Sequence, residues 1–285
     1  MDISIRLKIK SLYNGLSAKE QNIADYILEN PVFVAHNSIS DLSAELNVAS
    51  STLFQFAKKL GYSGFKDFKM AILLQENNFS DTSIHENIKI DDDHLTITQK
   101  VFDSNIKTLT DTKKILQLND LEKATEIIFN SNILYFFGIG GSEILAQDAY
   151  HKFLRSPVLV RHSTDYHMQL MEASLLTADD CAICISHTGK SKETINIAEI
   201  VKKLGAKVIV ITSDVSSPLA KLGDVVFVSV SEEIEFHSEA LSSRISQLSI
   251  LDSLYVILMI MNKEKSKEAL SKVRSNILEV KHKNL

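Results

Sequence analysis

The sequence of 285 residues contains no tryptophan, two cysteines, three prolines and nine glycines. So few glycines and prolines exclude a collagen-like or low-complexity chain, and two cysteines are too few for a disulfide-based scaffold. The apolar run at 254–261 is far shorter than the ~20 residues that span a bilayer. The N-terminal segment lacks the charged and apolar regions of a signal peptide, so we expect a cytoplasmic protein that does not enter a membrane.

The composition is otherwise that of a globular protein long enough for two domains, with 45% hydrophobic and 24% charged residues. Residues 1–80 carry eight basic and eight acidic side chains, so the formal net charge of −5 comes from the rest of the chain. Neither part is strongly basic, which excludes a protein that coats nucleic acid without sequence preference.

The two cysteines, Cys181 and Cys184, have the C-x-x-C spacing of redox and metal sites. They lie in "CAICIS", a segment typical of a strand, and residues three apart on a strand point to opposite faces. No second Cys or His pair lies nearby in the sequence to complete a zinc site. We therefore predict buried structural cysteines, with neither a metal nor a cofactor.

The first eighty residues consist of helical patterns with capping signals. Ser17, followed three residues later by Glu20, forms a capping box, and Pro31 closes the helix. A helix in "SISDLSAEL" is followed by a tight turn in "NVAS" and by a helix in "SSTLFQFAKKLG", which Gly61 ends. Two short helices across such a turn have the spacing of a helix-turn-helix, although a three-helix bundle without a DNA partner shows the same pattern.

In a helix-turn-helix the second helix enters the major groove with its N-terminal end. Here that end carries small hydroxyl residues, Gln55 suits a bidentate contact with adenine, and two lysines are placed to meet phosphates. The predicted DNA-binding residues are Ser50, Ser51, Thr52, Gln55, Lys58 and Lys59. The predicted packing face of the same helix is Leu53, Phe54, Phe56 and Leu60.

This region contains "IADYILENP", "SISDLSAEL" and "STLFQFAKKLGYSGFKDFK", and over its full length it resembles the N-terminal domain of RpiR-family transcriptional regulators. The resemblance implies that double-stranded operator DNA is a partner. Two residues depart from the family pattern. Gln55 replaces a usual arginine, which removes a phosphate or guanine contact, and Ala49 replaces a usual serine, which moves the predicted helix cap to Ser50.

The pattern changes in the second part of the chain. Residues 78–100 have weak periodicity and an acidic triplet, and we predict a linker there, between a helix-turn-helix domain at 1–77 and a larger domain at 101–285. Near-continuous apolar strands then alternate with helices. The predicted strands are 133–138, 157–160, 181–186, 207–212 and 224–230. The expected fold is therefore a small all-α domain followed by an α/β domain with a doubly wound parallel sheet.

In such a sheet, ligands bind beyond the carboxyl ends of the strands. The first strand ends in "GIGGSE", which nearly matches the dinucleotide fingerprint G-x-G-x-x-G, but Glu143 at the third glycine position would repel a pyrophosphate. The alternative is a turn that exposes its backbone at Gly141 and places Ser142 at a helix start, which suits a single phosphate.

The third strand ends in "SHTGKSKET", which is rich in hydroxyl groups. Ser186, His187, Thr188, Gly189 and Ser191 would wrap the N-terminus of the next helix. Hydroxyl and backbone N–H groups there donate to a phosphate, aided by the helix dipole. A simple N-cap is the alternative, but it needs one hydroxyl rather than three, so we predict a phosphate site.

Residues 120–255 are similar to the sugar isomerase (SIS) domain through "GIGGSEILA", the pattern "D.H.Q.M.ASLL...D", "ISHTGKSKET", "SPLAKLGDVV" and "SSRISQLSILD". In that family the motif at "ISHTGKSKET" is S-x-S-G-x-T, and Thr188 and Ser191 keep its hydroxyl groups. The resemblance implies that Ser142, Ser186, Thr188 and Ser191 hold the phosphate of a phosphorylated sugar.

Further residues of the site also follow from this resemblance. It places Asp165 and His167 near the sugar hydroxyls, although His167 is equally compatible with an ordinary surface histidine. Glu239 and Arg244 are expected to complete either the pocket or a contact between subunits.

Two classes of function are compatible with these motifs. The first is a transcriptional regulator whose SIS domain senses a phosphorylated sugar and alters operator binding, with sugar uptake or catabolism genes as targets. The second is a sugar-phosphate isomerase, which needs an acid and a base such as His167 and Glu239. The fused helix-turn-helix favours the regulator and predicts that the protein is not an enzyme. A scaffold that binds sugar phosphate without DNA affinity is a third possibility.

A homodimer or higher homo-oligomer is expected because paired helix-turn-helix domains bind palindromes.

Overall fold

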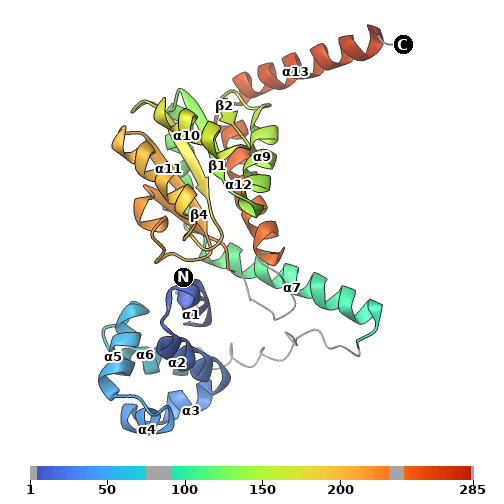
Figure 1. Cartoon of the computed structure of the whole chain (residues 1–285). Coiled ribbons are helices and arrows are strands. Elements are labelled where there is room, and N and C mark those ends of the chain that lie inside the picture. Colours follow the sequence, from blue (N-terminus) through green and yellow to red (C-terminus); the bar gives the residue numbers. More distant parts are fainter. Residues whose placement is uncertain (1–4, 75–91, 231–240, 284–285) are drawn as a thin grey trace. The chain divides into compact units, whose positions relative to one another are not determined.

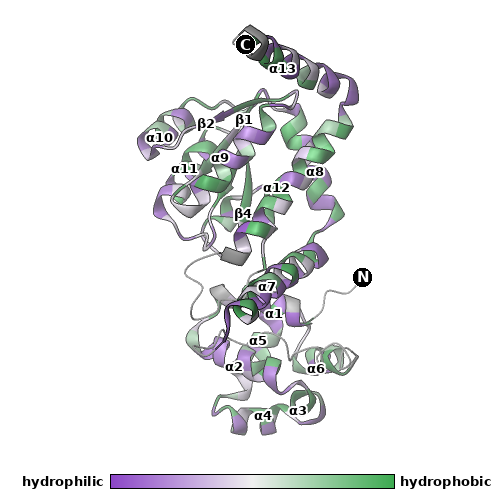
Figure 2. Cartoon of the chain, turned by 90° about the vertical axis from the view of Figure 1, so that its right-hand side faces the viewer, coloured by the Kyte–Doolittle hydropathy of each residue, from purple (hydrophilic) through white to green (hydrophobic). Residues whose placement is uncertain are grey.

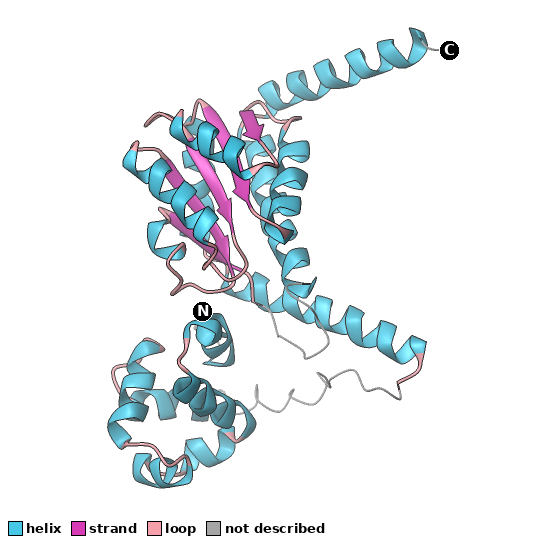
Figure 3. Cartoon of the chain, in the orientation of Figure 1, coloured by secondary structure: helices cyan, strands magenta, loops and turns pink. Residues whose placement is uncertain are grey.

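The computed structural model describes residues 5–74, 92–230 and 241–283, which form two compact units (Figure 1). The first unit contains the described residues up to Ile115, together with Val230. The second contains Leu116–Ser229 and the described residues from position 241 onward. The first unit is built of helices, and the second combines helices with a sheet (Figure 3).

Short, capped helices build most of the first unit. Its elements are α1 (Ile5–Leu12), the 3₁₀ helix η1 (Tyr13–Gly15), α2 (Ala18–Glu29), α3 (Pro31–His36), α4 (Ile39–Glu45), α5 (Ser50–Lys59), α6 (Phe65–Leu74) and α7 (His94–Ile115). Ser17 and Ser38 each accept a hydrogen bond from the backbone N–H three residues later, and Glu20 and Asp41 complete two capping boxes. The predicted capping box at Ser17 is confirmed.

Pro31 begins one helix as well as closing another. The sequence predicted the end of α2 there, followed by a short connecting segment, but α3 starts at Pro31. The fixed φ and missing N–H of proline suit the first turn of a helix. Asn30 is at once the C-cap of α2 and the N-cap of α3, so the two helices follow one another directly.

Residues 94–100, which were predicted as part of the linker, form the first turns of α7. Asp93 accepts hydrogen bonds from the backbone N–H (2.9 Å) and the hydroxyl (3.0 Å) of Thr96. The acidic triplet, which predicted a linker, therefore contains the residue that caps α7. The remainder of the predicted linker, residues 78–91, lies outside the described residues.

A single apolar core joins α1 to α6. Its largest buried side chains include Phe56 and Phe68, whose rings meet edge to face with centroids 6.5 Å apart. Asn47 turns the chain between α4 and α5 with a φ of 50°, and Gly61 follows α5 with a φ of 87°. Asparagine and glycine adopt this left-handed backbone most easily. The predicted tight turn and the helix end at Gly61 are confirmed.

A five-stranded parallel sheet with the order β2-β1-β3-β4-β5 forms the centre of the second unit. The elements are α8 (Leu118–Asn130), β1 (Ile133–Gly138), α9 (Gly141–Phe153), β2 (Leu159–His162), α10 (Tyr166–Ser174), β3 (Cys181–Ile185), α11 (Lys192–Lys203), β4 (Lys207–Thr212), η4 (Ala220–Leu222), β5 (Val225–Val228), α12 (Leu241–Met261) and α13 (Lys263–Lys283). The predicted α/β class and all five strands are confirmed. Strand β2 begins and ends two residues later than predicted. It lies at the edge of the sheet, where every second side chain is exposed, so the strand can include the charged Arg161.

Helices cover both faces of the sheet (Figure 1). Side chains of α8, α9 and α12 pack on one face, and side chains of α10 and α11 pack on the other. The central strands are hydrophobic along their length (Figure 2). The strand order reverses between β1 and β3, where Gly138 lies opposite Ile185. Ligands of such folds bind at this reversal, beyond the carboxyl ends of the two strands.

The two cysteines lie on opposite faces of β3, as predicted. Cys181 belongs to the core beneath α9 and α12, whereas Cys184 belongs to the core beneath α10 and α11. Both are free thiols and fully buried, and burial raises the pKa of each to about 12.

We expect both thiols to be inert in the native protein at pH 8 because each stays protonated and inaccessible below a pKa of about 12. Titration with a chromogenic disulfide reagent should detect no reactive thiol in buffer and two in denaturant. A rapid reaction of one thiol in the native protein would contradict the assigned burial of β3.

By length and composition alone, one helix among the described residues, Ser243–Met261 within α12, is apolar enough to cross a membrane. Four of its side chains instead pack against the sheet, namely Ile250, Leu251, Leu254 and Leu258. Core helices pass the same test, so this feature is weak evidence for a membrane span.

Candidate functional site

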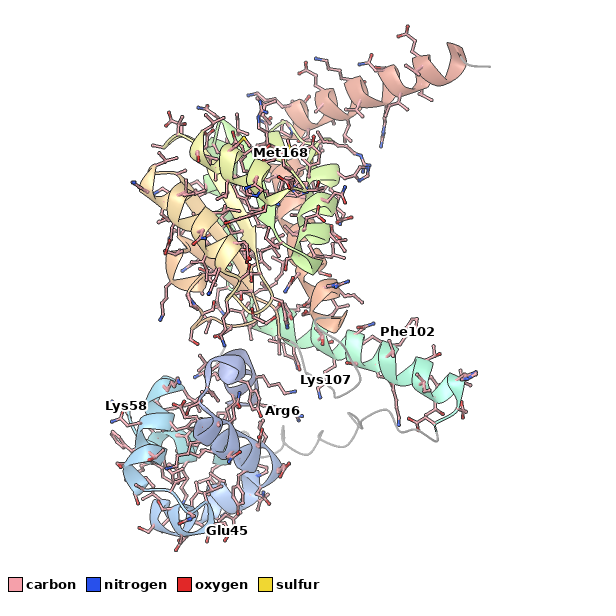
Figure 4. The ribbon with its side chains drawn as sticks, in the orientation of Figure 1. Arg6, Glu45, Lys58, Phe102, Lys107 and Met168 are labelled. Carbon is pink, nitrogen blue, oxygen red and sulfur yellow. The ribbon has the colours of Figure 1, made fainter. Side chains whose placement is uncertain are left out.

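Helix α5 presents the side chains that were predicted to contact DNA. Ser51, Gln55, Lys58 and Lys59 are exposed, and Thr52 is half-buried. Positions that are four, seven and eight residues apart share one face of a helix, so these side chains form a continuous strip. Figure 4 shows Lys58 on the outer side of the first unit. The strip offers hydroxyl, amide and ammonium groups, which are the groups that bind base edges and phosphates.

Two of the predicted DNA contacts are also bonded within the unit. The Ser50 hydroxyl lies 2.9 Å from that of Ser43, and Lys59 Nζ lies 3.1 Å from the Glu20 carboxylate. An exposed ion pair contributes only ~0.2–1 kcal/mol, so the bond to Glu20 does not prevent Lys59 from meeting a phosphate. The helix cap predicted at Ser50 is wrong: Ala49 is the N-cap, without a side-chain hydrogen bond, and Ser50 is the first helical residue.

Phe54 does not belong to the packing face of α5. Its side chain is 39% exposed, while Leu53 and Phe56 on either side are buried. A Cβ added to Gly64 would lie 2.9 Å from the Phe54 ring, and Lys58 Nζ lies 5.9 Å from the ring centroid. The ring therefore covers the backbone of the following turn and borders the strip that was predicted to contact DNA. Hydrophobicity alone had suggested the core, although the helical spacing places Phe54 between two core positions.

A glycine turn connects β1 to α9. Gly140 has a φ of 59° and is the N-cap of α9, where no side chain caps the helix. The backbone N–H groups of Ser142 and Glu143 donate to carbonyls of the turn, at 3.2 and 3.1 Å. Gly141 is the first helical residue, and the first N–H groups of a helix have no partner within it. The turn therefore offers backbone donors and the positive end of a helix to an anion.

Glu143, which interrupts the dinucleotide fingerprint, is held by the neighbouring strand. Its Oε1 lies 3.2 Å from Nε2 of His162, at the end of β2, and the other ring nitrogen lies 3.0 Å from the carbonyl oxygen of Phe136. The imidazole is almost completely buried. This carboxylate therefore has a fixed protein partner, and its negative charge in the first turn of α9 is also favoured by the helix dipole.

The loop that follows β3 is fixed by hydrogen bonds to the end of β4. The Ser186 N–H donates to the carbonyl oxygen of Ile211 (3.1 Å), and the His187 carbonyl accepts from the N–H of Ser213 (2.8 Å) and the hydroxyl of Thr212 (3.1 Å). The Ser213 hydroxyl also lies 2.8 Å from His187 Nδ1. Both the backbone and the ring of His187 thus anchor the loop to β4.

Gly189 lets the loop pass directly over the next turn of the chain. It has a φ of 63°, and a Cβ at this position would lie 2.1 Å from Ser217 Oγ and 2.9 Å from Thr212 Oγ1. Its N–H donates to the Ser186 carbonyl (3.2 Å), and its own carbonyl accepts from the Leu219 N–H (3.1 Å). No residue with a side chain fits both this backbone conformation and this space.

The four hydroxyls predicted to hold a phosphate divide into two pairs. Thr188 accepts from the backbone N–H two residues later (3.2 Å), and Ser191 caps α11 by accepting from the N–H three residues later (3.4 Å). The Ser142 and Ser186 hydroxyls form no hydrogen bond with another residue of the described chain. Ser191 therefore performs the N-cap role that was the simpler explanation of this motif. The Thr188 hydroxyl accepts one hydrogen bond and can still donate its own hydrogen, and the Ser142 and Ser186 hydroxyls are wholly available for a ligand.

The other predicted contacts around the sugar lie in the loop and helix after β2. Asp165 caps α10 by accepting from the Met168 N–H (3.0 Å). His167 is exposed, and its ring centroid lies 5.8 Å from that of Tyr166. Glu239 lies outside the described residues.

Gln169 was not among the predicted site residues, although it is fully buried at the end of β1. Its Nε2 donates to the carbonyls of Gly138 (3.0 Å) and Ser163 (2.8 Å), which ties the first strand end to the loop after the second. Its Oε1 is buried without a hydrogen-bond partner in the described residues. Buried polar groups normally have partners, so such an amide marks a structured site. The resemblance to the SIS domain includes Gln169, in the pattern "D.H.Q.M.ASLL", but it gave this residue no role.

The fold and the two corners define a class of protein: a helix-turn-helix unit joined to an α/β unit with a glycine turn and a hydroxyl-rich loop at its strand reversal. The model of the helix-turn-helix domain of the rpiR family matches residues 3–79, and that of the SIS domain matches residues 127–257. An uncharacterized HTH-type transcriptional regulator of Thermotoga maritima is 32% identical over 99% of this chain and 100% of its own length. The HTH-type transcriptional regulator RpiR of Escherichia coli K12 is 29% identical over 88% of this chain and 85% of its own. The chain belongs to the RpiR family of transcriptional regulators.

Solved structures agree with this fold over both units. The Vibrio vulnificus NanR protein, complexed with ManNAc-6P, has a TM-score of 0.61 at 24% identity and covers 98% of this chain and 99% of its own. Neighbours of the SIS domain also include a putative phosphosugar isomerase from Bacteroides fragilis, with a TM-score of 0.53 at 21% identity. At these identities the similarity establishes the fold, and function has to be argued from the site.

Proposed function

We propose that this transcriptional regulator binds a phosphorylated sugar through its SIS domain and that its operator affinity changes when the sugar is bound. Genes for sugar uptake or catabolism are the expected targets. The observation that carries the proposal is the pair of serines, Ser142 and Ser186, whose hydroxyls lack partners within the described chain. They follow two neighbouring strands: Ser142 lies in the first turn of α9, after β1, and Ser186 directly follows β3.

A phosphate monoester fits the donors at this place. It carries a charge of about −1.5 to −2 at pH 7 and three strong acceptor oxygens. The two serine hydroxyls, the Gly141 N–H and the positive ends of α9 and α11 all favour such a group. The sugar would extend toward the loop after β2, where His167 is exposed.

We propose that the protein does not catalyse isomerisation. Transfer of a proton between two sugar carbons needs a base within hydrogen-bond reach of the substrate. The SIS domain is instead fused to a helix-turn-helix whose strip of exposed residues serves DNA binding. An assay of aldose–ketose conversion with each sugar phosphate that binds should show no turnover above the rate without protein. Turnover with one of them would support the isomerase alternative.

We also propose a helix-turn-helix domain at 1–77, a SIS domain with flanking helices at 101–285, a cytoplasmic location and a homodimer or higher homo-oligomer. Exposed apolar side chains on the C-terminal helices support the oligomer. Val256 and Ile260 on α12 are 51% and 70% exposed, and Ile277 and Val280 on α13 are 52% and 59% exposed. Light scattering at micromolar concentration should therefore give at least twice the mass of the 31.9 kDa chain.

The double substitution Ser186→Ala and Thr188→Ala should abolish stabilisation by sugar phosphates. Each hydroxyl bonded to a charged phosphate contributes about 1.5–3 kcal/mol, so we expect affinity to fall at least 100-fold. The measurement is a thermal-shift panel of sugar phosphates that includes ManNAc-6P, in which a ligand at 100 times its Kd adds about 2.7 kcal/mol of stability. Ser275→Ala, on the exposed side of α13, is the control and should respond like the unaltered chain. An unchanged affinity in the double variant would show that the phosphate binds elsewhere.

A further inference from the structure

Arg244 lies in the first turn of α12, and its guanidinium group covers the start of α9. A Cβ added to Gly141 would lie 2.7 Å from one terminal nitrogen of Arg244, 3.4 Å from Cζ and 3.6 Å from Nε. A side chain at position 141 would therefore displace the arginine without straining the backbone, because no positive φ is found there. This contact joins two segments that are about one hundred residues apart in sequence.

The guanidinium has no anionic partner among the described residues. Its Nε is buried without a hydrogen-bond acceptor, and no carboxylate forms an ion pair with it. Glu143, the acidic residue in the first turn of α9, is paired with His162, and the first turn of α12 contains no acidic residue. An arginine in the first turn of one helix and beside the first turn of another experiences two unfavourable helix dipoles. A bound anion would compensate all three positive groups.

Two lysines lie near the corner that follows β3. Lys192, the first residue of α11, is exposed, whereas Lys190 is matched by a carboxylate. Lys190 Nζ lies 3.8 Å from Asp214 Oδ2, and that carboxylate is buried at the end of β4. The charge of Lys190 is therefore partly neutralised by the protein itself. Arg244 combines a position beside the Gly141 turn with a charge that no described side chain compensates.

We propose that Arg244 is the cationic residue of the effector site and that its guanidinium binds the phosphate group of the effector at the start of α9. This assignment rests on the proposed function, and it adds a charged donor beside the Gly141 turn. Arginine suits the task because its planar, paired N–H groups match two phosphate oxygens at once. It also makes the first turn of α12 part of the effector site, so that effector binding involves three helices of the second unit.

The test uses inorganic phosphate as the probe, titrated at constant ionic strength and followed by thermal unfolding of the full chain. Arg244→Gln keeps hydrogen-bond donors but removes the charge, and we expect it to weaken phosphate binding roughly 10- to 100-fold. Arg244→Lys should restore part of the affinity, because it returns the charge without the paired geometry. Arg274→Gln, on the exposed side of α13, is the charge-matched control and should leave phosphate affinity unchanged.

Gly141→Ala provides a second test that leaves the arginine in place. The added methyl group would meet only the flexible end of Arg244, so the fold should be retained while the guanidinium is displaced. We expect a loss of phosphate affinity similar to that of Arg244→Gln.

The outcomes separate this assignment from the proposed function. If Arg244→Gln and Gly141→Ala bind phosphate like the unaltered chain, while Ser186→Ala with Thr188→Ala does not, Arg244 is outside the site and the proposed function stands. If neither phosphate nor any sugar phosphate stabilises the unaltered chain, the proposed function fails and the assignment fails with it. Should Arg244→Gln not fold, the decision rests on Gly141→Ala.

Discussion

Replacing Gly189 by alanine is expected to lower the free energy of unfolding by about 2–5 kcal/mol and to abolish phosphate binding. The left-handed backbone alone costs a residue with a side chain about 1–2 kcal/mol. The added Cβ would also lie 2.1 Å from Ser217 Oγ and 2.5 Å from Ser217 Cβ, far inside van der Waals contact. Ser217 is buried, and its hydroxyl accepts from the Ala220 N–H (3.2 Å), so relief requires the whole loop to move.

Gly205→Ala is the matched control for this substitution. Gly205 belongs to the same unit and has a φ of 84°, but the nearest atom to an added Cβ is a methyl carbon of Ala178 at 3.4 Å. We expect a decrease of about 1–2 kcal/mol in the free energy of urea unfolding from backbone strain alone, with phosphate binding retained. If Gly189→Ala and Gly205→Ala lower the free energy of unfolding equally, the overlap with Ser217 costs nothing. That result would contradict the close packing of the loop on Ser217.

Operator DNA is expected to change sugar affinity by about 5- to 150-fold, the usual range for coupled sites. Helix α5 and the phosphate corners lie in different compact units, so a sugar can influence DNA binding only by favouring one arrangement of the protein over another. Thermodynamic reciprocity then requires the operator to alter sugar affinity by the same factor. Calorimetric titration of a sugar phosphate from the binding panel, with and without saturating operator, measures this factor directly.

Two variants serve as controls for the coupling experiment because each disables one site. Ser186→Ala should keep operator binding and lose the response to sugar phosphate. Thr52→Ala with Gln55→Ala should keep sugar binding and weaken operator binding, by about 1–3 kcal/mol for each hydrogen-bonded base that the side chains no longer reach. Identical sugar affinities with and without operator in the unaltered chain would show that the sites are uncoupled, and the sensor proposal would then be abandoned.

Local patterns in the sequence determined most of the fold. The apolar runs at 133–138 and 207–212 predict β1 and β4 to the residue, because strands covered on both faces contain few polar side chains. The capping box at Ser17 and the helix end at Gly61 are interactions within one turn, so neighbouring residues suffice to specify them. The separation of Cys181 from Cys184 follows from the alternation of side chains along one strand.

Other features were decided by contacts between segments far apart in the chain. Gln169 bonds to β1, His162 holds Glu143, and Arg244 covers Gly141, and no periodicity in the sequence records such pairings. Phe54 was misplaced because hydrophobicity outweighed helical spacing in the prediction, and only the structure shows that its ring covers Gly64. The sequence alone determined which segments are strands, helices and hydroxyl-rich turns, because those depend on neighbouring residues. Only the tertiary structure decided which charged and polar groups meet at the strand reversal, because that depends on the order in which the strands pair.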